Sequence, residues 1–187
     1  MSILNILEWP HPVLETRSKE VTEFNEEFQN LVKDMHLTMD HAKALGLASN
    51  QVGILQRVIV VHIPRSTNPD YPEEARPWHN TRYTFVNPVI IQRSQELFSY
   101  QEGCLSFPDI YEYIGRPAGV VVEAQDEFGK AFEIAADGLF ATCLQHEIDH
   151  IDGIVFFKRM SRLKASSVRK KMLKRELTSL RKDVSHG

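Results

Sequence analysis

Residues 144–153 read LQHEIDHIDG, and His146, Glu147 and His150 form an H-E-x-x-H pattern within them. Apolar residues recur around this stretch at helical spacing from position 139 onward, so we predict a mostly buried helix. Two histidines four residues apart lie on one helical face, where both imidazoles can point at one metal ion. Glu147 lies beside His146 around the helix axis and is placed to reach a water on that ion. Zinc peptidases carry this pattern, but three fixed positions in five also arise by chance.

A catalytic metal site needs a third protein ligand and an open position for water. The candidates downstream lack a ligand-like setting; they are Asp152, Glu176, Asp183 and His186. Upstream, in QEGCLSFP, Cys104 follows Gly103 in a segment that we expect to end a strand. A thiolate with two imidazoles suits Zn or Fe, so we predict Cys104 as the third ligand. The alternative for an isolated cysteine is a small buried hydrophobic residue, and we interpret Cys143 in that way, as part of the core or of a pocket wall.

A second segment of interest, ALGLASNQVG, covers residues 44–53. Gly46 as a helix stop and Gly53 as a turn residue would explain its glycines without any function. Gln51 has no obvious structural purpose, and an amide N–H directed into a site is suited to stabilise an oxyanion. On the residues alone, a packing role and a catalytic role for Gln51 both stay open.

The remaining pattern indicates an α+β fold in one domain over residues 1–187. With 42% hydrophobic residues the chain has enough apolar material for one core. We expect antiparallel or mixed sheets around the central metal-binding helix, with one helix before it and one after it. The expected segments are a helix over residues 25–44 with Asn25 as N-cap, strands at 57–63 and 84–91, a surface loop at 64–80, a β-hairpin at 119–136, a helix opened by Asp137 and Gly138, and a basic C-terminal helix at about 161–182.

Charge and cysteine content restrict the functional classes. The net charge of −3 gives no reason to expect DNA as a partner. Residues 158–182 hold eleven Lys or Arg against Glu176 alone, so this segment carries about +10 and the remainder about −13. Two cysteines are too few for a disulfide framework, and we find neither a signal peptide nor a run of about 20 apolar residues. We therefore expect a protein of the cytoplasm, bacterial or within an organelle, without membrane contact.

Three segments, in this order, resemble the motifs of the peptide deformylase family. GLASNQVG is similar to the first motif, EGCLS matches the second and QHEIDH matches the third. The cysteine stands roughly forty residues before the histidine pair, as in the family. Weaker likeness extends from ILEWPHPVL near the N-terminus to the basic segment, so the resemblance covers most of the chain.

The resemblance implies a role for individual residues. It implies that Cys104, His146 and His150 bind the metal and that Glu147 is the general acid and base. Gln51 and the backbone N–H of Leu105 would hold the oxyanion. Substrate contacts are implied for Gly46, which would let a peptide backbone run alongside, and for the positions near the methionine side chain, which are Leu45, Glu102, Gly103, Leu139 and Cys143.

The implied reaction is hydrolysis of the N-formyl group from the initiator methionine of nascent chains, with release of formate. The family resemblance implies Fe(II), with Zn, Ni or Co able to occupy the same ligands. The positive charge of the basic helix also suits a contact with the ribosome. A solvated face on a packing helix would explain the same charge equally well.

The sequence departs from the family pattern at two positions. Ala44 stands where a glycine is usual, and Ser49 replaces an alanine, whereas Asn50 occupies a position that varies. These changes touch neither a ligand nor Glu147, so they bear on efficiency and substrate preference. Two rival hypotheses are a zinc endoprotease, which the missing downstream ligand disfavours, and a deformylase-like protein that only binds a metal or a partner.

Overall fold

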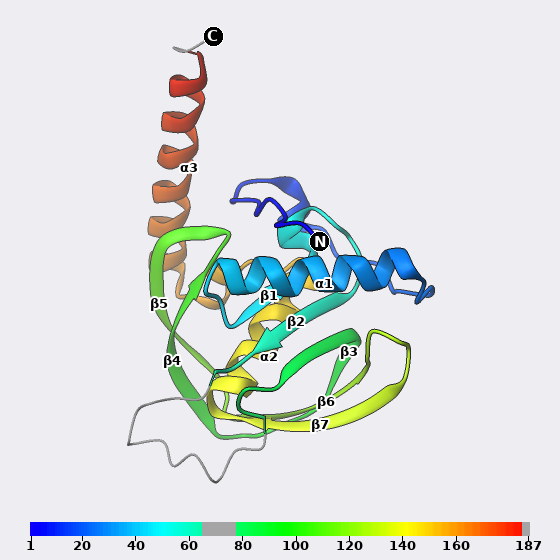
Figure 1. The fold of residues 1–187 in the computed structure, drawn as a ribbon. Helices are drawn as coiled ribbons and strands as arrows, with labels where there is room; N and C mark the ends of the chain where they lie inside the picture. Colours follow the sequence, from blue (N-terminus) through cyan, green and yellow to red (C-terminus); the bar gives the residue numbers. More distant parts are fainter. Residues whose placement is uncertain (65–77, 185–187) are drawn as a thin grey trace.

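The computed structural model describes residues 1–64 and 78–184, with the backbone alone for 179–184. Figure 1 shows its elements in chain order, which are η1 (Pro12–Glu15), α1 (Glu26–His41), β1 (Gly46–Ala48), η2 (Ser49–Val52), β2 (Val58–His62), β3 (Arg82–Arg93), β4 (Leu97–Cys104), β5 (Phe107–Pro117), β6 (Gly119–Gln125), β7 (Ala131–Asp137), α2 (Gly138–Ile151), η4 (Phe156–Arg159) and α3 (Arg162–Val184). None of the described helices combines the length and apolar character that a membrane crossing requires.

Five strands form an antiparallel sheet in the order β1-β2-β3-β6-β7. Successive side chains of a strand point to opposite faces of its sheet. On β2, Ile59 and Val61 pack in the cluster that contains the core residues of α2. Val58 and Val60 pack instead with the buried face of α1. The sheet is therefore covered by α2 on one face and by α1 on the other.

Helix α2 is the central element of the fold. Every residue from Phe140 to Ile151 is buried, which is typical of a core helix with apolar side chains around most of its circumference. Phe140, Leu144 and Ile148 belong to the main core cluster under the sheet. The polar residues of the H-E-x-x-H pattern are thus held in the interior, where each of them needs a partner.

Strands β4 and β5 form a separate two-stranded sheet. Their register shifts between Gly103 and Cys104, and Cys104 then pairs with Phe107 across a tight connection. Ile110 and Ile114 of β5 pack against the aromatic residues of η4. This hairpin brings the end of β4 against α2.

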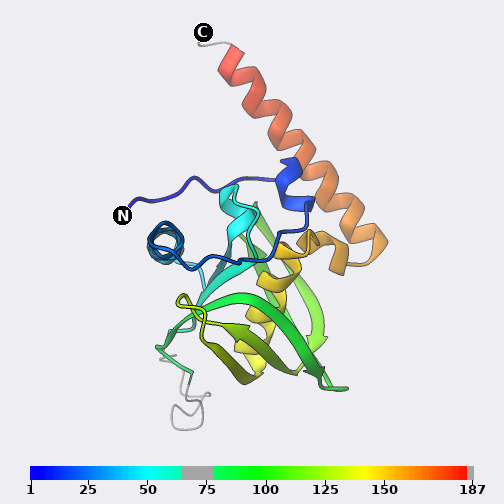
Figure 2. The same cartoon turned by 90° about the vertical axis from the view of Figure 1, so that its right-hand side faces the viewer.

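Helix α3 packs on the body through its first half and then stands out from it (Figure 1 and Figure 2). Val168 and Met172 are buried against the cluster that includes Trp9 and Phe157. The guanidinium of Arg169 lies over the rings of Trp9 and Phe157, at 5.9 and 5.4 Å from their centroids. Removing the first half of α3 would therefore uncover part of the core.

Most of the expected elements are confirmed. The side chain of Asn25 accepts a hydrogen bond from the N–H of Phe28 at the start of α1, which is the predicted N-cap. Gly129 has a φ of 85° in the turn between β6 and β7, and the helix after Asp137 begins at Gly138. The three-helix arrangement with antiparallel sheets is the predicted α+β fold. Of the predicted 64–80 loop, residues 65–77 lie outside the described part of the chain.

Two features differ from the expectation. Gly46 does not stop the first helix, because α1 ends at His41 and Gly46 is the first residue of β1. Lys43 takes the left-handed conformation after the helix instead, with a φ of 53°. Strand β5 and most of β4 were not predicted from the sequence.

Candidate metal centre

The two histidines of α2 lie one turn apart inside the protein, with ring centroids separated by 5.0 Å. His146 and His150 are 7% and 1% exposed. Burial lowers the pKa of His150 well below its ordinary value, and nearby positive charge adds to this effect. Burial of His150 therefore favours the neutral imidazole, which is the form that binds a metal ion.

Cys104 reaches the same place from the end of β4. Its Sγ lies 3.2 Å from Nε2 of His150, although the residues are 46 positions apart. One donor atom from each of Cys104, His146 and His150 lies within 4.8 Å of the others. Ligand bonds of about 2.0 to 2.3 Å to nitrogen and sulfur suit donors this close together. The donor set that the sequence indicated therefore converges in space.

The imidazole of His146 is oriented by a carboxylate. Its Nδ1 lies 2.7 Å from Oε2 of Glu102, so its Nε2 is the nitrogen left to face a metal ion. Burial by itself would lower the pKa of His146, but the hydrogen bonds with Cys104 and Glu102 outweigh it and raise this pKa. Both partners are acidic groups, so the surroundings of His146 favour positive charge. That charge is either a proton on the imidazole or a metal ion at its Nε2.

Glu102 belongs to a buried ionic network that the sequence reasoning did not find. Arg116 donates from Nε and Nη2 to both of its carboxylate oxygens, at 2.6 and 3.0 Å. Nη1 of Arg116 donates to Asp149 at 2.8 Å, and Arg159 also binds Asp149. Burial pushes the pKa of Glu102 upward, yet His146 and Arg116 together hold it below its ordinary value. The charge of Glu102 is thus engaged by Arg116 and His146.

Glu147 lies against the first residue of β1. A Cβ at Gly46 would stand 2.6 Å from Oε1 of Glu147, so only glycine leaves room for this carboxylate. Oε2 of Glu147 is buried without a hydrogen-bond partner among the described residues. Burial raises the pKa of Glu147 to about 7. A carboxyl group with such a pKa is suited to accept a proton and return it.

Gln51 approaches the centre from η2 and is 2% exposed. Its Oε1 accepts a hydrogen bond from the N–H of Ala48 at 2.9 Å, which fixes the orientation of the amide. Its Nε2 is thereby directed toward Sγ of Cys104, at 3.6 Å, and toward Oγ of Ser106, at 3.2 Å. The amide donor therefore stands beside the group of Cys104, His146 and His150 that could hold a metal ion.

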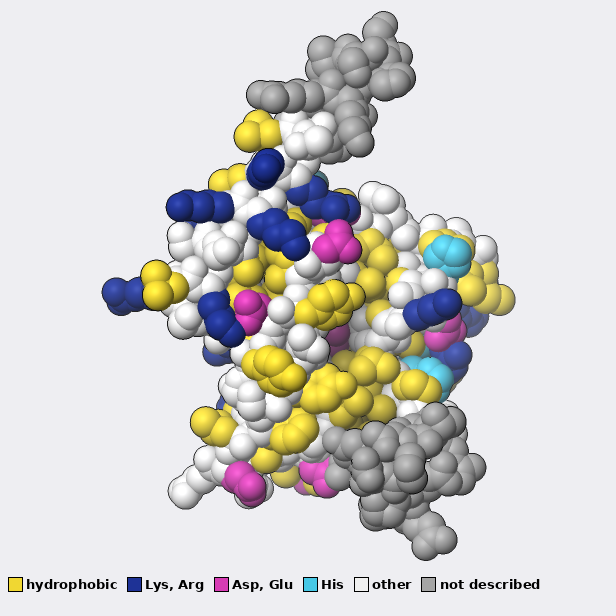
Figure 3. Space-filling model, turned by 90° about the vertical axis from the view of Figure 1, so that its left-hand side faces the viewer, with side chains coloured by type: hydrophobic (Ala, Val, Ile, Leu, Met, Phe, Trp, Pro, Cys, Tyr) yellow, Lys and Arg dark blue, Asp and Glu magenta, His cyan; other side chains and the backbone are white. Residues whose placement is uncertain are grey.

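A cavity of about 630 Å³ opens onto these groups. It is lined by every residue for which a catalytic or substrate role was expected, and by two of the three metal donors: Leu45, Gly46, Gln51, Glu102, Gly103, Cys104, Leu105, Leu139, Cys143, His146 and Glu147. On the face shown in Figure 3, hydrophobic side chains border a hollow in the body of the protein. A larger cavity, of about 890 Å³, lies between the N-terminal segment and α3 and contains none of these residues. The smaller cavity is therefore the candidate site.

The chain is similar to known proteins over nearly its whole length. A family model described as polypeptide deformylase matches residues 3–166. The peptide deformylase of Erythrobacter litoralis is 43% identical over 93% of this chain and 97% of that protein. The chain belongs to the peptide deformylase family. The peptide deformylase of Chromobacterium violaceum is 42% identical over 94% of this chain and 98% of its own length.

Solved structures of peptide deformylases have the same fold. That of the Ehrlichia chaffeensis peptide deformylase superposes with a TM-score of 0.86 at 38% identity, covering 95% of this chain and 99% of that one. A further structure of the Ehrlichia protein, in complex with actinonin, has a TM-score of 0.84. The chain is thus a metal-dependent hydrolase that removes the N-formyl group from the initiator methionine of nascent polypeptides and releases formate.

Proposed function

We propose that Cys104, His146 and His150 hold one divalent metal ion in this deformylase. The observation that carries this proposal is the approach of their three donor atoms to within 4.8 Å of one another. The bond from His146 to Glu102 gives further support, because metal-binding histidines commonly donate their other nitrogen to a carboxylate. When bound, the ion supplies Lewis acidity, which lowers the pKa of a water and polarises the formyl carbonyl.

Glu147 acts as the general base and then as the general acid. Its carboxylate accepts a proton from the attacking water and returns it to the amine that leaves with the methionine. Its contact with Gly46 holds it at the end of the cavity. Departure of the amine yields formate and a free N-terminus.

Gln51 and the N–H of Leu105 stabilise the negative oxygen that develops on the formyl group. We predict that Gln51→Leu lowers kcat by about 10²-fold, in line with the loss of one oxyanion donor. Steady-state kinetics with formyl-Met-Ala-Ser and a metal determination on the same samples measure this effect. Asn30→Leu, on the exposed side of α1, is the control and leaves kcat unchanged. A Gln51→Leu enzyme with full metal and native kcat would remove Gln51 from the mechanism.

The substrate lies along the free edge of β1. Leu45 accepts a hydrogen bond from the N–H of His62 on β2, so the peptide groups of the next residue, Gly46, face the opposite edge. An extended peptide can add to this edge by main-chain hydrogen bonds. The methionine side chain enters the part of the cavity near Leu139 and Cys143, while Leu45, Glu102 and Gly103 form its remaining wall.

The native ion in this proposal is Fe(II), with Zn, Ni and Co able to occupy the same ligands. We predict that iron-loaded enzyme loses activity in air, because the ferrous ion and the half-buried thiolate of Cys104 are both open to oxidation. Activity and metal content are compared between anaerobic and aerobic preparations. Equal activity in both, with zinc bound in each, would contradict an iron enzyme.

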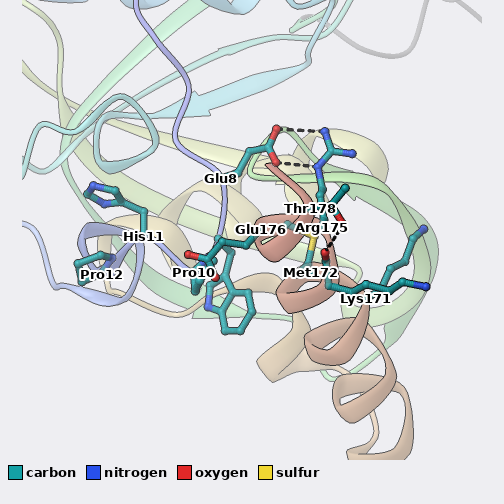
Figure 4. A pocket seen from close by; sticks show the side chains of 11 residues that line it. Glu8, Pro10, His11, Pro12, Lys171, Met172, Arg175, Glu176 and Thr178 are labelled. Carbon is teal, nitrogen blue, oxygen red and sulfur yellow. Dashed lines mark hydrogen bonds and ion pairs between the residues drawn. The ribbon is translucent and has the colours of Figure 1, made fainter. Parts of the chain in front are cut away.

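Residues 1–187 form one catalytic domain in this proposal, and α3 extends it toward the ribosome. The domain acts in the cytoplasm of a bacterium or inside an organelle, where formylated chains are made. Arg175 of α3 pairs with Glu8 at 2.8 Å across the larger cavity (Figure 4), and Lys171 donates to the carbonyl of Asp109. Arg162, Lys170 and Lys174 of α3 are exposed and make no ion pair, hydrogen bond or cation–π contact through their side chains with the described residues. These are available to RNA phosphates.

We predict that the double variant Lys170→Glu and Lys174→Glu weakens cosedimentation with ribosomes and that salt weakens it in the native enzyme. Charge reversal is a better test than truncation, because Val168 and Met172 are buried against the body. The control is the double variant Lys19→Glu and Lys130→Glu, which changes the net charge by the same amount on surfaces away from α3. Loss of association in both double variants, or in neither, would exclude a specific role of α3.

A further inference from the structure

Asn50 connects two parts of the active site that are distant in sequence. It lies on η2, is 0% exposed, and precedes Gln51 directly. Its Nδ2 donates a hydrogen bond of 2.5 Å to the backbone carbonyl of His150, 100 residues further along the chain. One side chain thus joins the segment that carries the oxyanion amide to the helix that carries the metal donors.

The two histidines of α2 are held in different ways. Nδ1 of His146 is fixed by Glu102, whereas Nδ1 of His150 has no hydrogen-bond partner among the described residues. His150 also stands in the last turn of α2, which ends at Ile151. Its carbonyl accepts from the N–H of Gly153, at 2.9 Å, just beyond the end of the helix, and also from Nδ2 of Asn50. The position of the His150 ring therefore depends on its backbone, and the amide of Asn50 is attached to that backbone.

The η2 segment is itself well anchored, which makes it a firm support. The carbonyl of Gln51 accepts from the N–H of Leu7, and the carbonyl of Ser49 accepts from the N–H of Ile54. The hydroxyl of Ser49 also binds the carbonyl of Gln56. The hydrogen bond from Asn50 therefore ties the carbonyl of His150 to a segment that is itself held in place.

The other half of the Asn50 amide indicates that packing alone does not explain this residue. Its Oδ1 is buried without a hydrogen-bond partner among the described residues. A buried polar atom left without a partner is unfavourable, and an apolar side chain of similar volume would avoid the cost. An apolar side chain could not make the bond from Nδ2 to the carbonyl of His150, so this bond accounts for an asparagine at position 50.

We propose that Asn50 is a positioning residue that sets the placement of the His150 ligand relative to the oxyanion donor Gln51. This inference rests on the proposed metal and oxyanion roles. It differs from them in that Asn50 touches neither the metal ion nor the substrate. Its effect passes through the backbone of His150.

The test uses Asn50→Ala and Asn50→Leu in the full-length enzyme loaded with Co(II), whose visible absorption reports the geometry of its ligands. We expect a shifted absorption band, metal release faster by about ten-fold or more, and kcat lowered by about ten-fold with KM changed less than about two-fold. Asn50→Leu nearly keeps the volume of the side chain and buries no unpaired polar group, so it gives a result even where Asn50→Ala does not fold.

Asn87→Ala is the control of the same residue type. Nδ2 of Asn87 likewise binds a distant carbonyl, that of Val21, at 2.9 Å, but Asn87 is not among the residues that line the cavity at Cys104 and His146. We expect it to lower thermal stability without changing the Co(II) spectrum or kcat. A native spectrum, metal release rate and kcat in both Asn50 variants would overturn the inference, as would equal changes in Asn87→Ala. Failure of the native enzyme to bind one Co(II) would instead overturn the proposed metal site.

Discussion

Glu147→Gln should lower kcat by about 10³-fold while the protein keeps its metal ion, since general acid–base catalysis contributes about 10²- to 10⁴-fold. Glutamine preserves the shape of the side chain in its contact with Gly46 but can no longer accept and return a proton. Because Glu147 is not one of the three convergent donors, metal content should not fall. The two results together separate proton transfer from metal binding.

The measurement is formate release at saturating formyl-Met-Ala-Ser, with metal per chain determined on the same preparations. Glu133→Gln on the exposed side of β7 makes the same chemical change outside the cavity and should leave kcat unaffected. A Glu147→Gln enzyme that holds metal and keeps more than a tenth of the native kcat would show that another group moves the proton.

Arg116→Met should destabilise the fold by about 3 to 5 kcal/mol, because it removes the cation shared by two buried carboxylates, which keep only His146 and Arg159 as partners. The side chains of Arg116 and Glu102 are 5% and 4% exposed, and that of Asp149 is 10% exposed. Methionine fills much of the space but pairs with neither acid. We also expect weaker metal binding, because Glu102 orients His146 and is itself held by Arg116.

Urea denaturation at equal metal occupancy measures the change in the free energy of unfolding. Arg82→Met is the control, since the pair of Arg82 with Asp40 is 48% and 39% exposed. An exposed pair of this kind contributes about 1 kcal/mol or less. A loss in Arg116→Met no larger than that in Arg82→Met would mean that the buried network contributes little to stability.

The parts of the fold that follow a local pattern were predictable. The helical period around His146 and the N-cap at Asn25 depend on neighbours within one or two turns, and both predicted helices are present. The hairpin around Gly129 is set by a short turn that needs a positive φ. The strands that the sequence did not reveal, β4 and β5, carry charged and aromatic residues on a partly exposed two-stranded sheet. Such strands lack the continuous β-branched runs that identify buried ones.

The candidate site was predictable where chemistry limits the residue types and not where pairing is long-range. Only a few side chains bind transition metals, so Cys104 could be selected before its distance to His150 was known. Arg116 could not be linked to Glu102 and Asp149, because that contact depends on the register of β4 with β5 and on their packing against α2. The residues alone suggested a helix stop at Gly46, since nothing local indicates that Glu147 needs the space of its missing side chain.

The most direct test of iron-dependent deformylation is formate release from formyl-Met-Ala-Ser by protein purified anaerobically with Fe(II). We predict formate and free N-terminal methionine in equal amounts, at a rate proportional to the iron bound per chain. The absence of formate from protein with one iron per chain, or cleavage at an internal peptide bond, would contradict it.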